Sequence, residues 1–379
     1  MIIQIILILF NIVTLPISIL VFTFHVLTGI KFVKFNDERI GHFGFNLEAC
    51  IRKNNDDVDK NYLIGLCSLN TSNMKLLGMY RRIIPIIRLP KILLDVIHLY
   101  YTKSVILVIL ENYEKISLDC RTEEEMKLPS SGIKLNLEEE MVGEVLCDSM
   151  RLKGEFVCFL ARDNSYLGEG YEYHDYRDVD INTLVPAMKY AVDKGMSSLR
   201  MGAKQVKFES HDKNIIDYAG KYRTELGDIY LCANCKFYVG DTSGLIAIPE
   251  LFGIPVIQIN TIPSFHVPRL QNGLYIPKKM WWKSRHRLLN FEEMLSYNIQ
   301  RTEDYEKLGI EIINNTSEEI LEVVKEMNER LDGNFKITEQ DERLQERYKE
   351  LYKRVTGYNL ECRIGKTFLR SNESLLITS

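Results

Sequence analysis

Short apolar runs alternate with longer amphipathic stretches through most of the chain, an alternation typical of an α/β protein. In the second half, apolar runs at residues 155–160, 197–201 and 237–239 are each followed by a polar segment and then by a helix-like stretch, and a further run lies at 256–259. Continuous apolar runs of this length are typical of strands buried on both faces of a parallel sheet. The pattern therefore predicts a Rossmann-like sheet with helices packed on it.

The first 30 residues are apolar and contain no Asp, Glu, Lys or Arg. A helix of this length is long enough to cross ~30 Å of hydrocarbon. Lys31 and Lys34 follow at once, which favours a cytosolic side for the rest of the chain. No basic region or small-residue cleavage site indicates a cleaved signal peptide. Three arrangements remain open: a single span, a re-entrant or interfacial hairpin bent at Pro16, and a buried apolar arm.

A second apolar run covers residues 90–110, but charged or polar residues recur within it: Lys91, Asp95, His98 and Lys103. These interruptions argue against a clean membrane span. Together with residues 1–30 and three nearby arginines (Arg81, Arg82 and Arg88), the run predicts an apolar, basic-rimmed face that lies on anionic lipid. The alternative is a core helix of a globular domain.

The first half contains a candidate catalytic base, His42. A strand is predicted at residues 30–35, and Gly41 and Gly44 flank His42 where that strand turns into a helix. Open α/β sheets bind ligands at such turns, and a neutral imidazole is suited to removing a proton from a hydroxyl group at neutral pH. The alternative is a turn histidine that only hydrogen-bonds locally.

Length, composition and charge limit the function classes. The 379 residues are enough for two domains, and the net charge of −4 gives no basic field for nucleic acid. The eight scattered cysteines indicate reduced thiols in a cytosolic compartment. We predict a membrane-associating segment at residues 1–30, a Rossmann-like domain at 31–150, a second Rossmann-like domain at 151–335, and a crossover helix with a loosely attached tail at 336–379; the motifs below suggest that the first domain takes an acceptor and the second a nucleotide-sugar.

The most informative stretch is residues 238–260, which predict a strand, a tight turn, a helix over 245–252 and a second strand. The turn from Gly240 to Gly244 offers backbone N–H groups and the Thr242 and Ser243 hydroxyls at a helix N-terminus, where phosphate is stabilised. Glu250 lies further along that helix, near enough to meet the sugar of a nucleotide. The alternative is an ordinary strand–helix–strand unit with small residues in its turn.

Two arginines follow neighbouring predicted strands. Arg162 and Arg200 lie at the C-terminal ends of these strands, which is the ligand-binding edge of such a sheet. Guanidinium groups bind phosphate through paired hydrogen bonds. The alternative for each arginine is a salt bridge to a nearby carboxylate, such as Asp163 or Asp178.

The order of these motifs resembles a family of bacterial surface-polysaccharide glycosyltransferases with the GT-B fold. The matching elements are Arg162, Tyr176-Arg177-Asp178, Arg200-Met201-Gly202, and the segment from Ser243-Gly244 to Glu250. The resemblance implies two Rossmann-like domains facing across a cleft. It further implies that Arg162, Arg200, Gly202, Thr242, Ser243, Gly244 and Glu250 bind the donor. His174, Tyr176, Arg177 and Asp178 would then serve the acceptor or the structure.

Two further motifs, a D-x-D sequence and a C-x-x-C pair, are candidates for metal binding. Asp178-Val179-Asp180 is a D-x-D sequence, but it precedes a helix and follows a polar loop, so we expect Asp180 to cap the helix rather than bind metal. Cys232 and Cys235 form one C-x-x-C pair without a second pair at suitable spacing, so we expect packing residues rather than a zinc site.

The resemblance and the residues together predict a metal- and cofactor-independent glycosyltransferase at the cytoplasmic face of the cell membrane. It would move a sugar from a nucleotide-sugar to a lipid-linked or surface-glycan acceptor, with fixed cations and helix dipoles stabilising the departing phosphate. One alternative is a nucleotide-sugar epimerase or hydrolase on the same fold. Another is a non-catalytic scaffold of a glycan-assembly complex.

Overall fold

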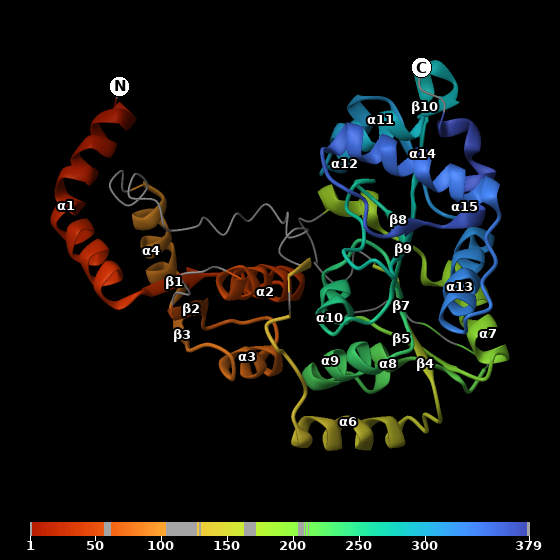
Figure 1. Ribbon diagram of the computed structural model, residues 1–379, viewed down its shortest axis with the longest axis horizontal. Coiled ribbons are helices and arrows are strands. Elements are labelled where there is room, and N and C mark those ends of the chain that lie inside the picture. Colours follow the sequence, from red (N-terminus) through yellow and green to blue (C-terminus); the bar gives the residue numbers. More distant parts are fainter. Residues whose placement is uncertain are drawn as a thin grey trace. The chain divides into compact units, whose positions relative to one another are not determined.

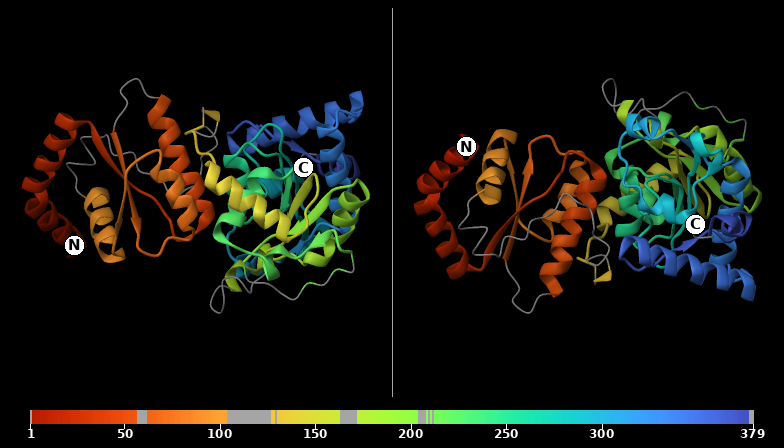
Figure 2. Two further views of the ribbon diagram at one scale, coloured as in Figure 1. Left: turned by 90° about the horizontal axis from the view of Figure 1, so that it is seen from below. Right: turned by 90° about the horizontal axis from the view of Figure 1, so that it is seen from above.

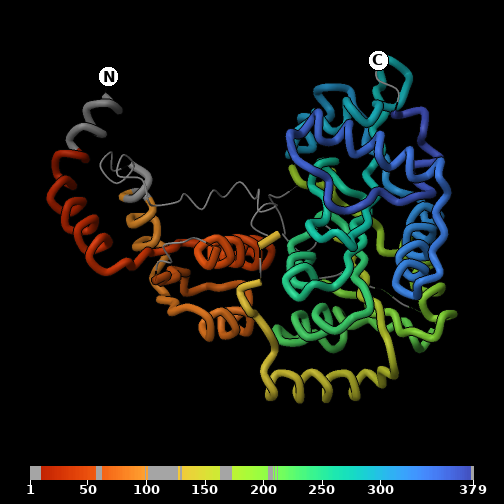
Figure 3. The backbone as a smooth tube through the Cα atoms, in the orientation of Figure 1, coloured from red at the N-terminus to blue at the C-terminus, as the bar shows by residue number. Residues whose placement is uncertain are grey.

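The computed structural model describes residues 2–56, 62–103, 127–128, 130–162, 172–203, 208, 210 and 212–376. The chain forms two compact units, Met1–Leu135 and Asn136–Ser379. Both are mixed α/β units built on parallel sheets (Figures 1 and 3). Each unit is described by itself below.

The first unit is a three-stranded parallel sheet in the order β1-β2-β3. Its elements in chain order are α1 (Ile2–Thr28), β1 (Ile30–Lys34), α2 (Ile40–Asp56), β2 (Tyr62–Ser68), α3 (Met74–Arg81), β3 (Ile86–Leu89) and α4 (Lys91–Lys103). Helices α1 and α4 lie on one face of the sheet and α2 and α3 on the other (Figure 2). The sheet is therefore covered on both faces, as parallel sheets require.

Helix α2 is held by an apolar row and by one buried charge. Phe43, Leu47 and Ile51 recur at the spacing of one helix face and are buried. The Glu48 carboxylate, also buried, accepts hydrogen bonds from Arg52 Nε at 2.7 Å and from Ser131 Oγ at 2.6 Å. The helix begins at Ile40, so His42 lies in its first turn rather than in the turn that we predicted before it.

Helix α1 has two different faces. Phe10–Thr28 has a mean hydropathy of 2.0, is long enough to cross a membrane, and is only 17% buried within the structure. Its polar side chains recur on the covered face, where Ser18 and His25 are buried. Tyr100 of α4 donates a hydrogen bond to Ser18 Oγ at 2.9 Å. Apolar side chains occupy the other face, and Val13, Leu20 and Leu27 are each at least 70% exposed.

The second unit is a seven-stranded parallel sheet in the order β13-β9-β8-β7-β4-β5-β6. Its strands are β4 (Phe156–Leu160), β5 (Ser197–Arg200), β6 (Ile215–Ile216), β7 (Tyr238–Gly240), β8 (Val256–Thr261), β9 (Leu274–Pro277) and β13 (Arg363–Ile364). The four strands predicted from the apolar runs are confirmed and lie side by side in the middle of this sheet.

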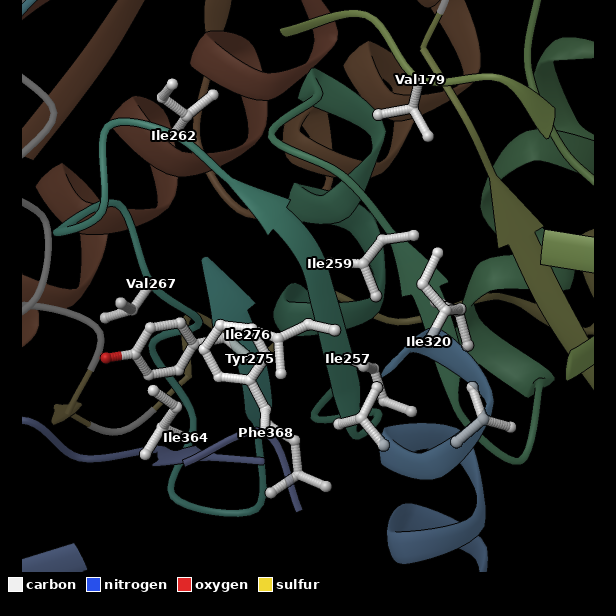
Figure 4. Packing of buried hydrophobic residues seen from close by; sticks show 14 of the residues in the cluster. Val179, Ile257, Ile259, Ile262, Val267, Tyr275, Ile276, Ile320, Ile364 and Phe368 are labelled. Carbon is white, nitrogen blue, oxygen red and sulfur yellow. The ribbon is translucent and has the colours of Figure 1, made fainter. Parts of the chain in front are cut away.

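Helices cover both faces of the sheet (Figure 1). One layer holds α7 (Val185–Asp193) and α13 (Ser317–Leu331); the other holds α9 (Glu225–Asn234) and α10 (Ala247–Leu251). Ile257 and Ile259 of β8 pack with Ile320 of α13, and Tyr275 of β9 packs with Phe368 (Figure 4). This apolar core packs helices against the strands whose C-terminal ends carry the candidate residues.

The boundary between the units lies at Leu135/Asn136, not after residue 150. Helix α6 (Leu137–Ser149) begins with a capping box between Asn136 and Glu139. It packs on α9, where Gly143 lies directly against the Tyr230 ring. A Cβ atom at residue 143 would come within 2.1 Å of that ring, so this close approach assigns α6 to the second unit.

The stretch at 261–290 contains β9, β10 (Lys279–Trp282) and β11 (Arg287–Leu288). Strands β11, β10 and β12 (Ile310–Ile313) form a separate sheet in which β10 pairs antiparallel with both neighbours. Strand β12 is therefore not part of the main sheet.

The C-terminal residues are packed rather than loosely attached. Helix α14 (Glu339–Thr356) packs against α11 (Phe291–Ser296) and α15 (Lys366–Ser371) within the second unit. Tyr348 of α14 receives a hydrogen bond from the Tyr275 hydroxyl at 2.9 Å. Phe368 and Leu369 of α15 are buried. Residues 336–376 therefore complete the core of the second unit.

Candidate functional site

The strand order of the second unit reverses direction between β4 and β7. From β4 the chain adds β5 and β6 on one side, and it then returns to add β7, β8 and β9 on the other. In open α/β sheets the loops that follow the two strands at such a point diverge, and ligands bind between them. Here the two loops begin at Ala161-Arg162 and at Asp241. Arg162 N donates a hydrogen bond to Asp241 Oδ2 at 2.5 Å, and this bond connects the two loops at their first residues.

The Arg162 guanidinium is oriented by one of its nitrogen atoms. Nη1 donates to Asp178 Oδ1 at 2.7 Å and to the His174 carbonyl at 3.1 Å. The salt bridge to Asp178 that we considered as an alternative is therefore present. Among the described residues, Nε and Nη2 make no hydrogen bond, and the side chain is 11% exposed. The group is held rigidly while two of its nitrogen atoms keep donors for a ligand.

The segment from His174 to Asp178 is held over this edge by a buried lysine. It forms the 3-10 helix η3 (Glu172–Arg177) and the residue that follows. Lys278, which is 1% exposed and follows β9, donates from Nζ to the Tyr176 carbonyl at 2.8 Å and to the Asp178 carbonyl at 3.1 Å. The sequence does not single out Lys278, because its only local signal is a lysine directly after Pro277.

Arg177 adds a second guanidinium to the same region. Its Nη2 lies 2.7 Å from His174 Nδ1, and its guanidinium carbon lies 5.4 Å from the centre of the Tyr176 ring. Burial raises the pKa of Asp241 and lowers the pKa of Lys278; the Arg177 charge opposes the first shift and adds to the second. The charges of three cations, Arg162, Arg177 and Lys278, therefore act on the Asp241 carboxyl, and this favours an anionic ligand.

The D-x-D sequence has local partners. Asp178 is paired with Arg162, and Asp180 accepts a hydrogen bond from Asn182 N at 2.9 Å at the start of the 3-10 helix η4 (Ile181–Leu184). Within the part of the chain that the structure describes, no group of three metal-ligating side chains is found. The expected capping role of Asp180 is confirmed.

The turn after β7 differs from our prediction in its helix. Residues 244–252 form a 3-10 helix, η5 (Gly244–Ile246), and then only the five residues of α10. A helix this short has a small dipole, so side-chain cations rather than the helix must provide most of the positive charge here. Thr242 Oγ1 accepts hydrogen bonds from Gln258 Nε2 at 3.2 Å and from Ile262 N at 3.3 Å, and thereby ties this turn to the loop after β8.

Several buried polar atoms at this edge have no hydrogen-bond partner among the described residues. They are Asp241 Oδ1, Ser243 Oγ, Asn260 Nδ2 and Ser264 Oγ, from the ends of β7 and β8. Burial raises the pKa of the Tyr238 hydroxyl well above its usual value, and the nearby Ser243 Oγ opposes this rise only weakly, without hydrogen-bond geometry. Because buried polar groups are nearly always paired in proteins, such a cluster marks a place where a polar ligand or water completes the structure.

Burial shifts the protonation of two charged groups. The Asp241 carboxyl is 0% exposed, and its burial raises its pKa to about 6. The hydrogen bond from Arg162 N and the charges of the neighbouring cations lower the pKa and so limit this rise. Burial lowers the pKa of Lys278 to about 8, against the attraction of Asp241 and Asp178. Strongly perturbed groups of this kind cluster at functional sites.

Other candidate donor-binding residues have protein partners. Arg200 is 1% exposed; its Nη1 lies 3.4 Å from Asp217 Oδ1, and its guanidinium lies over the Phe208 ring. Gly202 follows with a φ of 136°, which favours glycine. The Glu250 carboxylate is buried and accepts hydrogen bonds from Arg269 N at 2.7 Å and Arg269 Nη1 at 3.4 Å.

His42 belongs to the first unit, where it is half-buried in the first turn of α2. The other candidate residues, from Arg162 to Glu250, all belong to the second unit. Of these, Arg162, the His174–Asp178 segment and the turn after β7 are brought together around Asp241.

No protein-family model matches the chain, and no curated protein sequence matches it significantly. It is similar to the ADP-heptose LPS heptosyltransferase II of E. coli, with 12% identity, a TM-score of 0.44, and coverage of 65% of this chain and 89% of that one. It is also similar to a glycosyl transferase family 9 protein of Veillonella parvula, with 9% identity, a TM-score of 0.43, and coverage of 65% and 86%. Both neighbours are glycosyltransferases, and at these TM-scores the likeness carries no argument about this site.

Proposed function

We propose that the second unit binds a nucleotide-sugar and that the chain transfers the sugar to a lipid-linked or surface-glycan acceptor. The observation that carries the proposal is the Arg162 guanidinium at the point where the strand order reverses. One of its nitrogen atoms is fixed by Asp178 and His174, and two keep their donors. A fixed guanidinium at this edge is suited to a phosphate ester, because its hydrogen bonds need no reorganisation when charge develops.

The departing nucleoside phosphate would bind against Arg162, with the charges of Arg177 and Lys278 close by. The hydroxyls and N–H groups of the turn from Thr242 to Gly244 would complete its contacts. These fixed cations can stabilise the leaving group's charge without a metal ion. Arg200 and Gly202, at the end of β5, would border the same site. Glu250 would hold ribose hydroxyls only by exchanging part of its contact with Arg269.

A lipid-linked acceptor fits the first unit. Ser18 on the covered face of α1 receives a hydrogen bond from Tyr100 of α4, while large apolar side chains are exposed along Phe10–Thr28, from Ile12 to Leu27. An apolar helix of 19 residues matches the ~30 Å thickness of the hydrocarbon core. We propose that α1 inserts in the cell membrane, with the rest of the chain at its cytoplasmic face. His42 remains our candidate for the base that accepts the acceptor's proton.

The experiment is a screen of nucleotide-sugars for release of free nucleotide, with and without a membrane lipid extract. We expect release with one donor class, and stimulation by lipid. Arg162→Met should lower the affinity for nucleotide by at least ~10-fold, because a charged hydrogen bond is lost. Arg343→Ala is the control, since this arginine is exposed on α14. Unchanged nucleotide affinity in Arg162→Met contradicts the proposal.

The screen also separates the two alternatives. An epimerase or hydrolase acts on the donor without an acceptor, so its turnover would not depend on the lipid extract. A scaffold would bind no nucleotide, and no donor would raise its melting temperature.

A further inference from the structure

We propose that Asp241 and Lys278 together bind one hydroxyl group of the donor's sugar, an inference that rests on the proposed function. The two side chains come from different loops of the same sheet edge, one after β7 and one after β9. The pair would make the site selective for a sugar over a bare nucleotide.

The first observation is the half-paired state of Asp241. Its Oδ2 accepts the Arg162 N–H, while its Oδ1 has no partner in the part of the chain that the structure describes, and the residue is 0% exposed. A buried carboxylate oxygen without a hydrogen bond is unfavourable by itself. Asp241 Oδ1 can therefore accept a hydrogen bond from a ligand.

The second observation is that the Lys278 ammonium uses two of its three N–H donors. An ammonium group has three N–H donors, and two of them go to the carbonyls of Tyr176 and Asp178. Those two carbonyls also fix the position of the nitrogen atom. The third donor has no hydrogen-bond partner within the described residues, so it can donate to an acceptor on a ligand.

The third observation is how these groups relate to each other. Asp241 is the strongest attractive charge acting on Lys278, yet the two form no direct hydrogen bond among the described contacts. Both groups lie after strands that end at the same edge of the sheet, and each has one hydrogen-bonding position left among the described residues. A polar atom that donates to the carboxylate and accepts from the ammonium would satisfy both positions.

A hydroxyl group meets both requirements, because it donates one hydrogen bond and accepts two. A phosphate oxygen meets only one, since it cannot donate to an ionised Asp241 and is repelled by its charge. The phosphate would therefore bind on the Arg162 side, and the hydroxyl-rich sugar on the Asp241–Lys278 side.

The test compares two ligands, a nucleotide-sugar that the wild-type protein turns over and the nucleotide that it releases. Asp241→Asn keeps the shape and the contact with Arg162 N but can place an amide where Oδ1 was. Lys278→Met keeps the aliphatic stem without the ammonium. For each variant we expect ~10–100-fold weaker binding of the nucleotide-sugar, the usual effect of losing a hydrogen bond to a charged group. In Asp241→Asn, binding of the nucleotide alone should change less than ~2-fold. Lys278 also holds the segment that orients Arg162, so Lys278→Met should weaken nucleotide binding as well, but at least ~5-fold less than it weakens nucleotide-sugar binding.

Asp180→Asn is the matched control, because Asp180 is a carboxylate of the same region that only caps η4. Calorimetric titration at neutral pH measures both affinities, and a thermal melt confirms that each variant is folded. An equal loss for nucleotide and nucleotide-sugar would assign the pair to the phosphate and overturn the proposal. Unchanged binding of both ligands would overturn it as well, leaving water as the bridging group. Failure of the wild-type protein to bind any nucleotide-sugar would instead end the proposed function.

Discussion

The backbone N–H of Arg162 lies 2.5 Å from Oδ2 of Asp241, and this hydrogen bond joins the ends of β4 and β7. The two strands are neighbours in the sheet, although Arg162 and Asp241 lie 79 positions apart in the sequence. The bond uses the carboxylate as an anchor for the loop that carries the Arg162 guanidinium. A substitution of Asp241 that removes this acceptor, such as Asp241→Ala, should therefore displace the loop, whereas Asp241→Asn keeps an oxygen that can accept the bond.

Asp241 should make the protein less stable at high pH. Its pKa is raised from 3.8 to about 6 by burial, so the folded state binds more protons than the unfolded state between these values. Stability is then lost as pH rises through this window, by about 3 kcal/mol for a two-unit shift. We expect Asp241→Asn to be more stable than the wild type at pH 8 and to lose this advantage near pH 4. Thermal melts across this pH range measure the difference. A difference that does not change with pH would contradict it.

Glu48 should be essential to the first unit. It is 0% exposed and receives hydrogen bonds from Arg52, Tyr80 and Ser131. Glu48→Ala leaves the buried Arg52 charge without its partner, and we expect a loss of about 3–5 kcal/mol. Hydrogen exchange of the β1 and β2 amides reports this loss for the first unit alone.

The control for Glu48 is Glu38→Ala, which removes an ion pair with Lys91 between largely exposed side chains. Exchange of the same amides should stay close to that of the wild type, because exposed pairs contribute little. If both substitutions had the same effect, burial of Glu48 would not be the cause.

Gly143 should be intolerant of a side chain. A Cβ atom there would lie 2.1 Å from the Tyr230 ring, so Gly143→Ala forces α6 away from α9, at a cost of ~1–3 kcal/mol. We expect faster hydrogen exchange in both helices. Gly78→Ala in α3 is the matched control, since no atom lies within 4 Å of its added Cβ. There the higher helix propensity of alanine should stabilise α3 by ~0.5–1 kcal/mol. Hydrogen exchange of α6 that is as slow in Gly143→Ala as in the wild type would contradict this prediction.

The exposed face of α1 should hold the protein on membranes. Leu20 lies near the middle of Phe10–Thr28 and is 70% exposed. A lysine at the centre of a membrane helix costs ~2.5–3.5 kcal/mol, so Leu20→Lys should release protein from the membrane fraction after an alkaline carbonate wash. Leu137→Lys, which alters an exposed leucine of α6, should stay bound like the wild type. Complete release of the wild-type protein by the wash would argue against insertion.

The sequence by itself determined the local elements and the type of sheet. The apolar runs predicted β4, β5, β7 and β8 because strands buried on both faces need continuous apolar residues. The starts of α6 and α13 are equally local, because Asn136 and Thr316 satisfy N–H groups of their own helices. These features depend on residues that are close together in the chain.

Only the tertiary structure decided the membership of the site. Lys278 and Asp241 lie 37 positions apart in sequence but act on each other, because the strand order places β9 and β7 on the same side of β4. In the folded chain the Glu250 carboxylate accepts a hydrogen bond from Arg269. The helix predicted after Gly244 is only five residues long, Ala247–Leu251. Burial and pairing of charges depend on contacts between distant segments, and periodicity along the chain carries no record of them.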